Sequence, residues 1–190
     1  MWVVKLGGSL HDAPALRHWL ERLATMPGPP LVVVPGGGPF ADAVRALQPA
    51  LGVGELAAHC MAILAMQQFG LALQALEPRL SLAETETELR SATAAVWLPW
   101  RLAGRSPELE ASWEVTSDSI ACWLATRLAA SDLVLVKSAA VAGEAEIERL
   151  LAEPGLVDPA FAHYRRRFAG RVRILHRDAW ASFTYDPPHG

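Results

Sequence analysis

The first 50 residues contain the same short unit twice: an apolar run, then a cluster of glycines, then a helical pattern. Trp2–Leu6 leads into Gly7-Gly8 and a helical stretch over about 13–25. The uncharged run 31–34 leads into Pro35–Pro39 and a second helical stretch over about 40–47. Repeated alternation of strand and helix predicts an α/β fold with a mostly parallel sheet and helices on its faces.

Further segments continue this alternation. We expect strands at 94–98, 133–136 and 172–175, helices at about 55–76, 119–125 and 144–152, a loop at 101–112, and either an exposed loop or a short helix at 80–90. The stretch 56–76 carries no formal charge, but its His59 and three glutamines would be costly in a membrane. We therefore expect it to be a helix buried on most sides of a soluble core.

Composition excludes several classes of protein. Hydrophobic residues make up 52% and charged residues 19%, which favours a packed core over disorder. The net charge of −3 gives no overall electrostatic footprint for nucleic acid. Cys60 and Cys122 do not form a disulfide framework, and we expect them to be packing residues. We expect one domain, no nucleic-acid or membrane partner, and a cytoplasmic location.

Four clusters of polar residues or glycines lie just beyond the carboxyl ends of expected strands. They are Lys5 with Gly7, Gly8 and Ser9; Gly36, Gly37 and Gly38; Thr116, Ser117 and Asp118; and Lys137 with Ser138. In open parallel sheets the ligand crevice lies outside the carboxyl ends of the strands. The sequence therefore predicts that the four clusters converge on one site.

The glycine clusters suit an anion such as phosphate. Glycine lets the backbone approach a ligand closely, and a following helix start presents free N–H groups. An ordinary strand-to-helix turn is the alternative for Gly7-Gly8, and a flexible turn is the alternative for residues 36–38. The Walker-type spacing is absent from both.

The charged residues leave two interpretations open at this stage. Asp118 either caps a helix, or it orients Lys5 and Lys137 or holds Mg²⁺. Lys137 lies either at the solvent edge or in the crevice. His59, on an apolar helix, is either a core residue or part of a binding site.

Four blocks of this sequence resemble the amino acid kinase superfamily. They are VVKLGGSL at the start, VVVPGGGPFAD from residue 32, EVTSDSIACWLA from 114 and LVLVKS from 133. The SWEVTSDSI and PGGGPFAD segments most resemble the branch that includes the aminomethylfuran-phosphate kinase of methanofuran biosynthesis. The resemblance implies a three-layer αβα sandwich with a shortened C-terminal nucleotide lobe. It divides the single domain 1–190 into an acceptor-side lobe (about 1–130) and a reduced nucleotide-side lobe (about 131–190).

The resemblance also implies roles for the clustered residues. Lys5, Asp118 and Lys137 would be catalytic, with Asp118 organising the lysines and no side-chain metal site. Donor phosphates would lie against Gly7, Gly8, Ser9, Lys137 and Ser138, and the acceptor against Gly36, Gly37, Gly38, His59, Thr116 and Ser117. ATP with Mg²⁺ would be the donor, and a homo-oligomer is implied.

The implied function is a small-molecule kinase acting on a phosphate or carboxylate oxygen, with a furan-methyl phosphate of C1-carrier biosynthesis as the specific acceptor. The stretch 138–143 departs from the superfamily, because it lacks both residues of the usual Asp-x-Asp-Gly pattern. This departure favours the alternative function, a non-catalytic kinase-like subunit that binds a ligand or partner.

Overall fold

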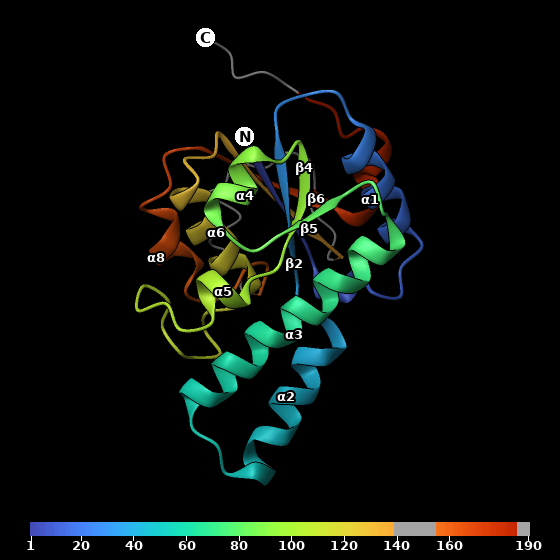
Figure 1. Ribbon diagram of the computed structural model, residues 1–190. Helices are drawn as coiled ribbons and strands as arrows, with labels where there is room; N and C mark the ends of the chain where they lie inside the picture. Colours follow the sequence, from blue (N-terminus) through green and yellow to red (C-terminus); the bar gives the residue numbers. More distant parts are fainter. Residues whose placement is uncertain (139–154, 186–190) are drawn as a thin grey trace.

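A computed structural model describes residues 1–138 and 155–185, and its centre is a six-stranded sheet (Figure 1). The strands are β1 (Trp2–Leu6), β2 (Leu31–Pro35), β3 (Ser81–Ala83), β4 (Ala94–Trp97), β5 (Asp132–Lys137) and β6 (Arg171–His176). They are ordered β3-β4-β2-β1-β5-β6, and every adjacent pair is parallel. All carboxyl ends therefore meet at one edge of the sheet.

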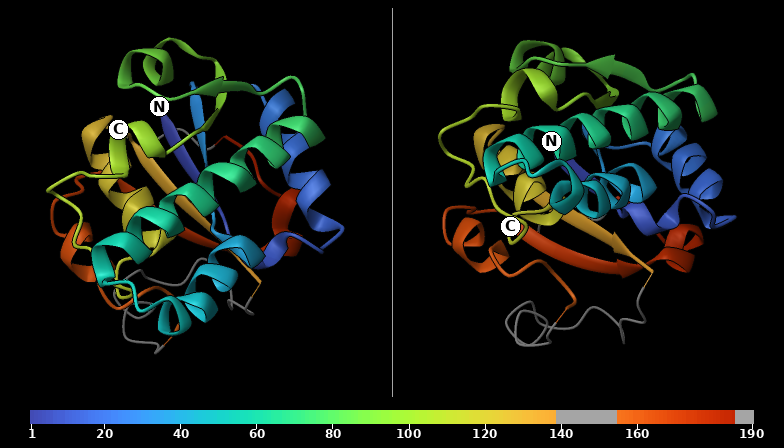
Figure 2. Two further views of the ribbon diagram at one scale, coloured as in Figure 1. Left: turned by 60° about the horizontal axis from the view of Figure 1, so that its bottom comes forward. Right: turned by 90° about the horizontal axis from the view of Figure 1, so that it is seen from below.

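Helices cover both faces of this sheet. They are α1 (Ala15–Thr25), α2 (Gly38–Leu51), α3 (Glu55–Leu76), α4 (Glu86–Ser91), α5 (Trp100–Ala103), α6 (Ser117–Arg127) and α8 (Phe161–Arg165), with 3-10 turns η1 (Gly8–Leu10) and η2 (Arg177–Ala181). Helix α1 lies on one face, and α4, α6 and α8 lie on the other, while α2 and α3 form a hairpin whose second helix, α3, also packs against β2, β4 and α1 (Figures 1 and 2). This arrangement confirms the predicted αβα sandwich.

Two hydrophobic clusters hold these layers together, and the alternation of side chains along each strand separates them. Val3 and Leu133 face the cluster beneath α6 and α8, whereas Val4 and Val134 face the cluster beneath α1. Helix α3 contributes to both, with Ile63 in the first cluster and other residues in the second.

The long helix α3 is less enclosed than the sequence suggested. Eight of its residues are buried, but a row of apolar side chains on the other side is exposed, including Leu56, Leu64 and Leu71. The prediction that it is buried on most sides is therefore wrong. By length and composition it is the one helix among the described residues that could cross a membrane, and 44% of its most apolar window is buried.

Most other predicted elements are confirmed, with differences at their edges. Helix α2 begins within the glycine cluster at Gly38 and continues to Leu51, so the third glycine is the first helical residue. The open segment 80–90 contains strand β3 and a short helix, which Thr85 and Glu88 cap reciprocally. The expected loop at 101–112 begins as helix α5. The helix expected at 144–152 lies outside the described residues.

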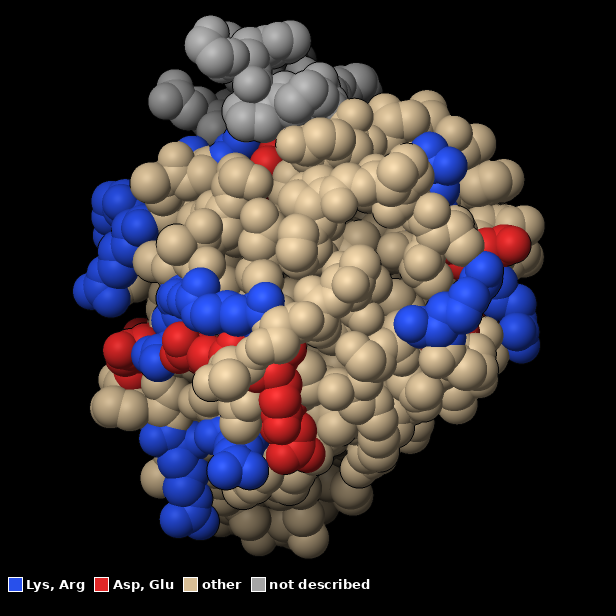
Figure 3. Space-filling view, turned by 45° about the horizontal axis from the view of Figure 1, so that its top comes forward, with Lys and Arg blue, Asp and Glu red and all other residues tan. Residues whose placement is uncertain are grey.

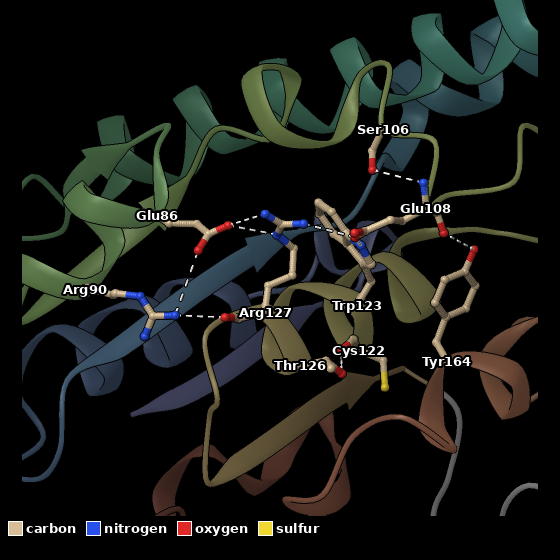
Figure 4. Close-up of polar contacts among 9 residues, drawn as sticks. All are labelled: Glu86, Arg90, Ser106, Glu108, Cys122, Trp123, Thr126, Arg127 and Tyr164. Carbon is tan, nitrogen blue, oxygen red and sulfur yellow. Dashed lines mark hydrogen bonds and ion pairs between the residues drawn. The ribbon is translucent and has the colours of Figure 1, made fainter.

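A network of polar side chains fixes the far end of α6 (Figure 4). Arg127 pairs with Glu86 of α4. It also pairs, at 3.0 Å, with Glu108 in the loop between α5 and α6. Glu108 also accepts a hydrogen bond from the indole N–H of Trp123. On the face drawn in Figure 3, acidic and basic side chains are interleaved, without a broad patch of one sign.

Candidate functional site

Two lysines and one aspartate meet at the carboxyl edge of the sheet. Lys5 projects from β1 and Lys137 ends β5, the strand beside it. Asp118, in the first turn of α6, reaches both: its Oδ1 lies 2.8 Å from Lys5 Nζ, and its Oδ2 accepts a hydrogen bond from Lys137 Nζ. The carboxylate thus bridges the two ammonium groups.

These are the only two lysines in the sequence, among 17 Lys and Arg residues. All three side chains are largely withdrawn from solvent, with 6% exposure for Lys5, 5% for Asp118 and 15% for Lys137. Both carboxylate oxygens face an ammonium group, so the geometry is that of a carboxylate orienting two cations. Asp118 does not accept the cap hydrogen bond at the start of its own helix.

Burial and charge act in opposite directions on this cluster. Burial alone would raise the pKa of Asp118, but the charges of Lys5 and Lys137 hold that pKa below its ordinary value. Burial, followed by repulsion from Lys5, lowers the pKa of Lys137 despite its attraction to Asp118. The cluster therefore keeps its carboxylate ionised beside two desolvated cations.

The two glycine turns pack directly against each other. A Cβ atom on Gly8 would lie 2.2 Å from the amide nitrogen of Gly38, and one on Gly36 would lie 2.2 Å from that of Gly8. Gly38 also has a φ of +55°, which favours glycine. The glycines are thus required for the close approach of two backbones beside the lysine cluster.

Some amides of these turns are already engaged. Gly7 donates to the carbonyl of Val136 at 3.2 Å, and Gly36 donates to that of Leu6 at 2.9 Å. These two bonds extend the parallel pairing into the turns. The hydroxyls of Ser9 and Ser138 lie 2.7 Å apart, so the segments that follow β1 and β5 are also joined.

Four of the six residues predicted to hold the acceptor line a small cavity of about 80 Å³, whereas Gly36 and Gly38 are not among its lining residues. It is lined by Gly37, Ala41, Arg45, His59, Ala62, Ile63, Met66, Trp113, Val115, Thr116, Ser117 and Ile120. His59 is buried, and this burial lowers its pKa, so it is neutral at pH 7. A larger open groove of about 860 Å³ adjoins the cavity at His59, between the start of α3 and residues 104–111.

Among the lining residues that were not predicted for the site, two have side chains suited to binding an anionic ring compound. Arg45 of α2 stacks on the ring of Trp113, with 4.4 Å between the guanidinium carbon and the ring centroid. The indole N–H of Trp113 donates to Gln48 of the same helix at 2.6 Å. Arg45 lies seven residues after Gly38 on the helix that the glycine cluster begins. Seven residues are about two helical turns, so Arg45 lies on the same side of α2 as Gly38, and this was the one signal in the sequence that could have pointed to Arg45.

The structure brings the predicted residues to one end of the sheet. Lys5, Asp118 and Lys137 are in direct contact, the two glycine turns pack together, and Ser9 meets Ser138. His59, Gly37, Thr116 and Ser117 share the cavity. The hydroxyl and amide of Thr116 are, however, bound to the carboxylate of Asp158, a residue that the sequence did not point to.

The family model that matches this sequence describes the amino acid kinase family, and it covers residues 1–141. The chain belongs to that family. It is similar to the [5-(aminomethyl)furan-3-yl]methyl phosphate kinase of Methanocaldococcus jannaschii, with 30% identity over 139 residues. This match spans 71% of the present chain and 64% of the relative's length.

Solved structures share the fold. The uridylate kinase of Archaeoglobus fulgidus superimposes with a TM-score of 0.68 at 15% identity, and the match covers 96% of each chain. The UMP kinase of Bacillus anthracis gives a TM-score of 0.65 at 15% identity, covering 93% of this chain and 87% of that one. At this identity the likeness establishes the architecture alone.

Proposed function

We propose that this protein is a small-molecule kinase that transfers the γ-phosphoryl group of ATP to a phosphate or carboxylate oxygen. The observation that carries the proposal is the pair of desolvated lysines held by Asp118 at the carboxyl edge of the sheet. Phosphoryl transfer depends mainly on prepositioned positive charge, because its transition state spreads negative charge over the transferred oxygens.

In this mechanism an acceptor oxygen forms a bond to the γ-phosphorus while the bond from that phosphorus to the β–γ bridging oxygen breaks, and ADP leaves. An anionic acceptor oxygen has no proton to lose. Lys5 and Lys137 neutralise the developing charge, and Asp118 keeps their ammonium groups in place. Gly7, Gly8, Ser9 and Ser138 flank the donor phosphates. Mg²⁺ would be carried by the phosphates of ATP, as Mg²⁺ commonly is in kinases.

The cavity beside Thr116 and Ser117 is the proposed acceptor site, and Gly37 of the second glycine turn lines it. Its wall is largely apolar, and Arg45 stacked on Trp113 supplies a positive charge and a flat ring. A small ring that carries one phosphate fits this combination. We propose a furan-methyl phosphate as the specific acceptor, which the relative from Methanocaldococcus jannaschii supports, because its name specifies such a substrate.

We also propose that the protein forms a homo-oligomer through the exposed face of α3. From Leu56 to Leu76 this helix has no Asp, Glu, Lys or Arg. Partly or fully exposed residues recur along this helix at alternating steps of four and three residues. This is the spacing at which two helices pack against each other. The residues are Ala57, Met61, Leu64, Gln68, Leu71 and Ala75. An uncharged face of this kind can meet its own copy without charge repulsion.

The test combines calorimetry of ATP with Mg²⁺ and an ADP-release screen over furan phosphates, nucleotides and acidic amino acids. We expect binding of ATP and turnover with a furan-methyl phosphate. Lys5→Met should lower kcat by roughly a hundredfold or more, because one prepositioned charge is lost. Arg171→Met is the matched control, since Arg171 pairs with buried Asp132 at the opposite end of β5.

Near-full turnover in folded Lys5→Met would contradict the proposed mechanism. If the folded wild-type protein gave neither heat nor a thermal shift with ATP and Mg²⁺, the chain would instead be a non-catalytic ligand- or partner-binding subunit.

A further inference from the structure

Asp158 is a buried carboxylate far along the chain from the lysine cluster, yet it is bound to the start of α6. It is 8% exposed and accepts four hydrogen bonds. Its Oδ2 accepts from the Thr116 amide at 3.0 Å, the Thr116 hydroxyl at 2.8 Å and the Ser119 amide at 3.0 Å. Its Oδ1 accepts from the Ser119 hydroxyl.

These contacts replace the usual helix cap. In most helices the residue before the first turn accepts a hydrogen bond from the third helical amide through its own side chain. Thr116 occupies that position, but its hydroxyl donates to Asp158. The amide of Ser119, the third residue of α6, is bound by Asp158, which lies 39 residues further along the chain.

The segment around Asp158 is itself well anchored. Leu156 and Phe161 on either side of it are buried in the same hydrophobic cluster as Ile120 of α6. The amide of Ala160 donates to the carbonyl of Glu114 at 3.2 Å. The carboxylate is therefore presented to the helix start by packed backbone on both sides.

The turn that Asp158 holds also carries Asp118, whose two oxygens orient the lysines. A shift of that turn would move Asp118 relative to both strands, because Lys5 and Lys137 are fixed by the sheet. Asp158 also adds a second negative charge close to the cluster, and its attraction opposes the loss of the proton from Lys137. Lys137 is thus attracted by two carboxylates, Asp118 in direct contact and Asp158 at longer range.

We propose that Asp158 is a positioning residue: it fixes the first turn of α6, and so sets where Asp118 holds the ammonium groups of Lys5 and Lys137. Its effect on turnover rests on the proposed kinase function, whereas its effect on the lysines does not. The two parts can therefore be tested separately.

Two substitutions separate charge from geometry. Asp158→Asn keeps an oxygen for the amides of Thr116 and Ser119 but removes the negative charge, whereas Asp158→Ala removes both. Glu108→Gln is the matched control, because Glu108 also contacts α6, at its opposite end, through Trp123 and Arg127. Urea unfolding of every variant establishes the conditions under which each is folded.

The lysine readout uses the fact that the chain contains two lysines only. Protein labelled with ¹³C-lysine gives two side-chain Cε signals, and their titration reports each ammonium group separately. We expect the Lys137 signal to titrate at lower pH in Asp158→Asn than in the wild type. In Asp158→Ala both signals should also change in chemical shift, while Glu108→Gln should leave both unchanged.

The activity readout is kcat against KM for ATP and for the acceptor. Asp158→Ala should lower kcat by roughly tenfold to a hundredfold, since small displacements of positioned groups have effects of that size. Asp158→Asn should lie between Asp158→Ala and the wild type. If folded Asp158→Asn and Asp158→Ala leave both lysine signals as in the wild type, Asp158 is only a structural cap and the proposal is overturned. An inactive wild-type protein with the expected lysine shifts would instead refute the kinase function alone.

Discussion

At the scale of single residues, the chain uses lysine for one purpose. Of the 17 Lys and Arg residues, the 15 outside the cluster are all arginines, while the two positions that meet Asp118 are lysines. A lysine ammonium is a compact point charge with three donors, whereas an arginine guanidinium is a wide planar fork. Two compact charges can share one buried carboxylate and still present hydrogens to a third group.

This cluster makes stability depend on pH in one direction. The folded-state pKa of Asp118 lies below its ordinary value, so the unfolded chain takes up the proton first as the pH falls. The contribution is complete above pH 4 or so, the ordinary pKa of an aspartate, and is lost as the pH drops toward the folded-state pKa. The free energy of unfolding should therefore fall more steeply below about pH 4 in the wild type than in Asp118→Asn.

Urea unfolding of both proteins between about pH 5 and pH 3 measures this difference. At pH 7 Asp118→Asn should already be less stable, by about 3–5 kcal/mol, because two buried ammonium groups lose their counter-charge. Groups that titrate elsewhere are common to both proteins and cancel in the comparison. Parallel stability profiles for the two would show that Asp118 is not held ionised as described.

At the scale of elements, the contact between the two glycine turns explains why both are so rich in glycine. Gly8→Ala would place a methyl group against the backbone of Gly38, where no flexible side chain can move away. We expect a loss of about 1–3 kcal/mol or more in the free energy of unfolding. Gly54→Ala is the control, since nothing lies within 4 Å of its added methyl group.

Urea denaturation of the two glycine variants provides the measurement. Gly54→Ala should stay within about 1 kcal/mol of the wild type, because it changes only the residue before a helix. Equal stability of Gly8→Ala and Gly54→Ala would mean that the turns do not pack as closely as described.

The strands were predictable because their physical signal is strong and local. Leu31–Pro35 is apolar and buried along its whole length. An uncharged run rich in β-branched residues is typical of a strand that is covered on both faces of a parallel sheet. The short edge strand Ser81–Ala83 was missed because it has two exposed residues and no such run. Helix α3 was predicted to be more buried than it is, because apolar composition does not indicate which sides of a helix are covered by other elements.

The candidate site was predictable where it follows from topology. Parallel strands bring Lys5 and Lys137 to one edge, so their convergence needed no knowledge of side-chain contacts. Asp158 could not be found in this way, because its partners Thr116 and Ser119 are about 40 residues away and no local pattern links them. The pairing of Arg45 with Trp113 likewise depends on how α2 packs.

At the scale of the whole molecule, the apolar face of α3 predicts an assembly. Leu64 and Leu71 are 39% and 48% exposed, high values for leucines one heptad apart on a single helix. Substituting both by glutamate should convert an oligomer into a monomer in sedimentation-velocity runs over a wide range of protein concentration. Leu82→Glu, an equally exposed leucine on β3, should leave the wild-type distribution unchanged.

The competing outcome is also measurable. A wild-type protein that sediments as a monomer at every concentration, and floats with lipid vesicles, would show that this face contacts a membrane and not a second copy.

The position of Asp158 has a consequence for how the protein is made. Both lysines and Asp118 are synthesised before Asp158, the acceptor for the amide of Ser119. A nascent polypeptide that stops at residue 138 therefore contains the sheet strands of the cluster but leaves the first turn of α6 without its cap. The first turn of α6, and with it Asp118, can therefore be fixed in place only after residue 158 has been added to the polypeptide.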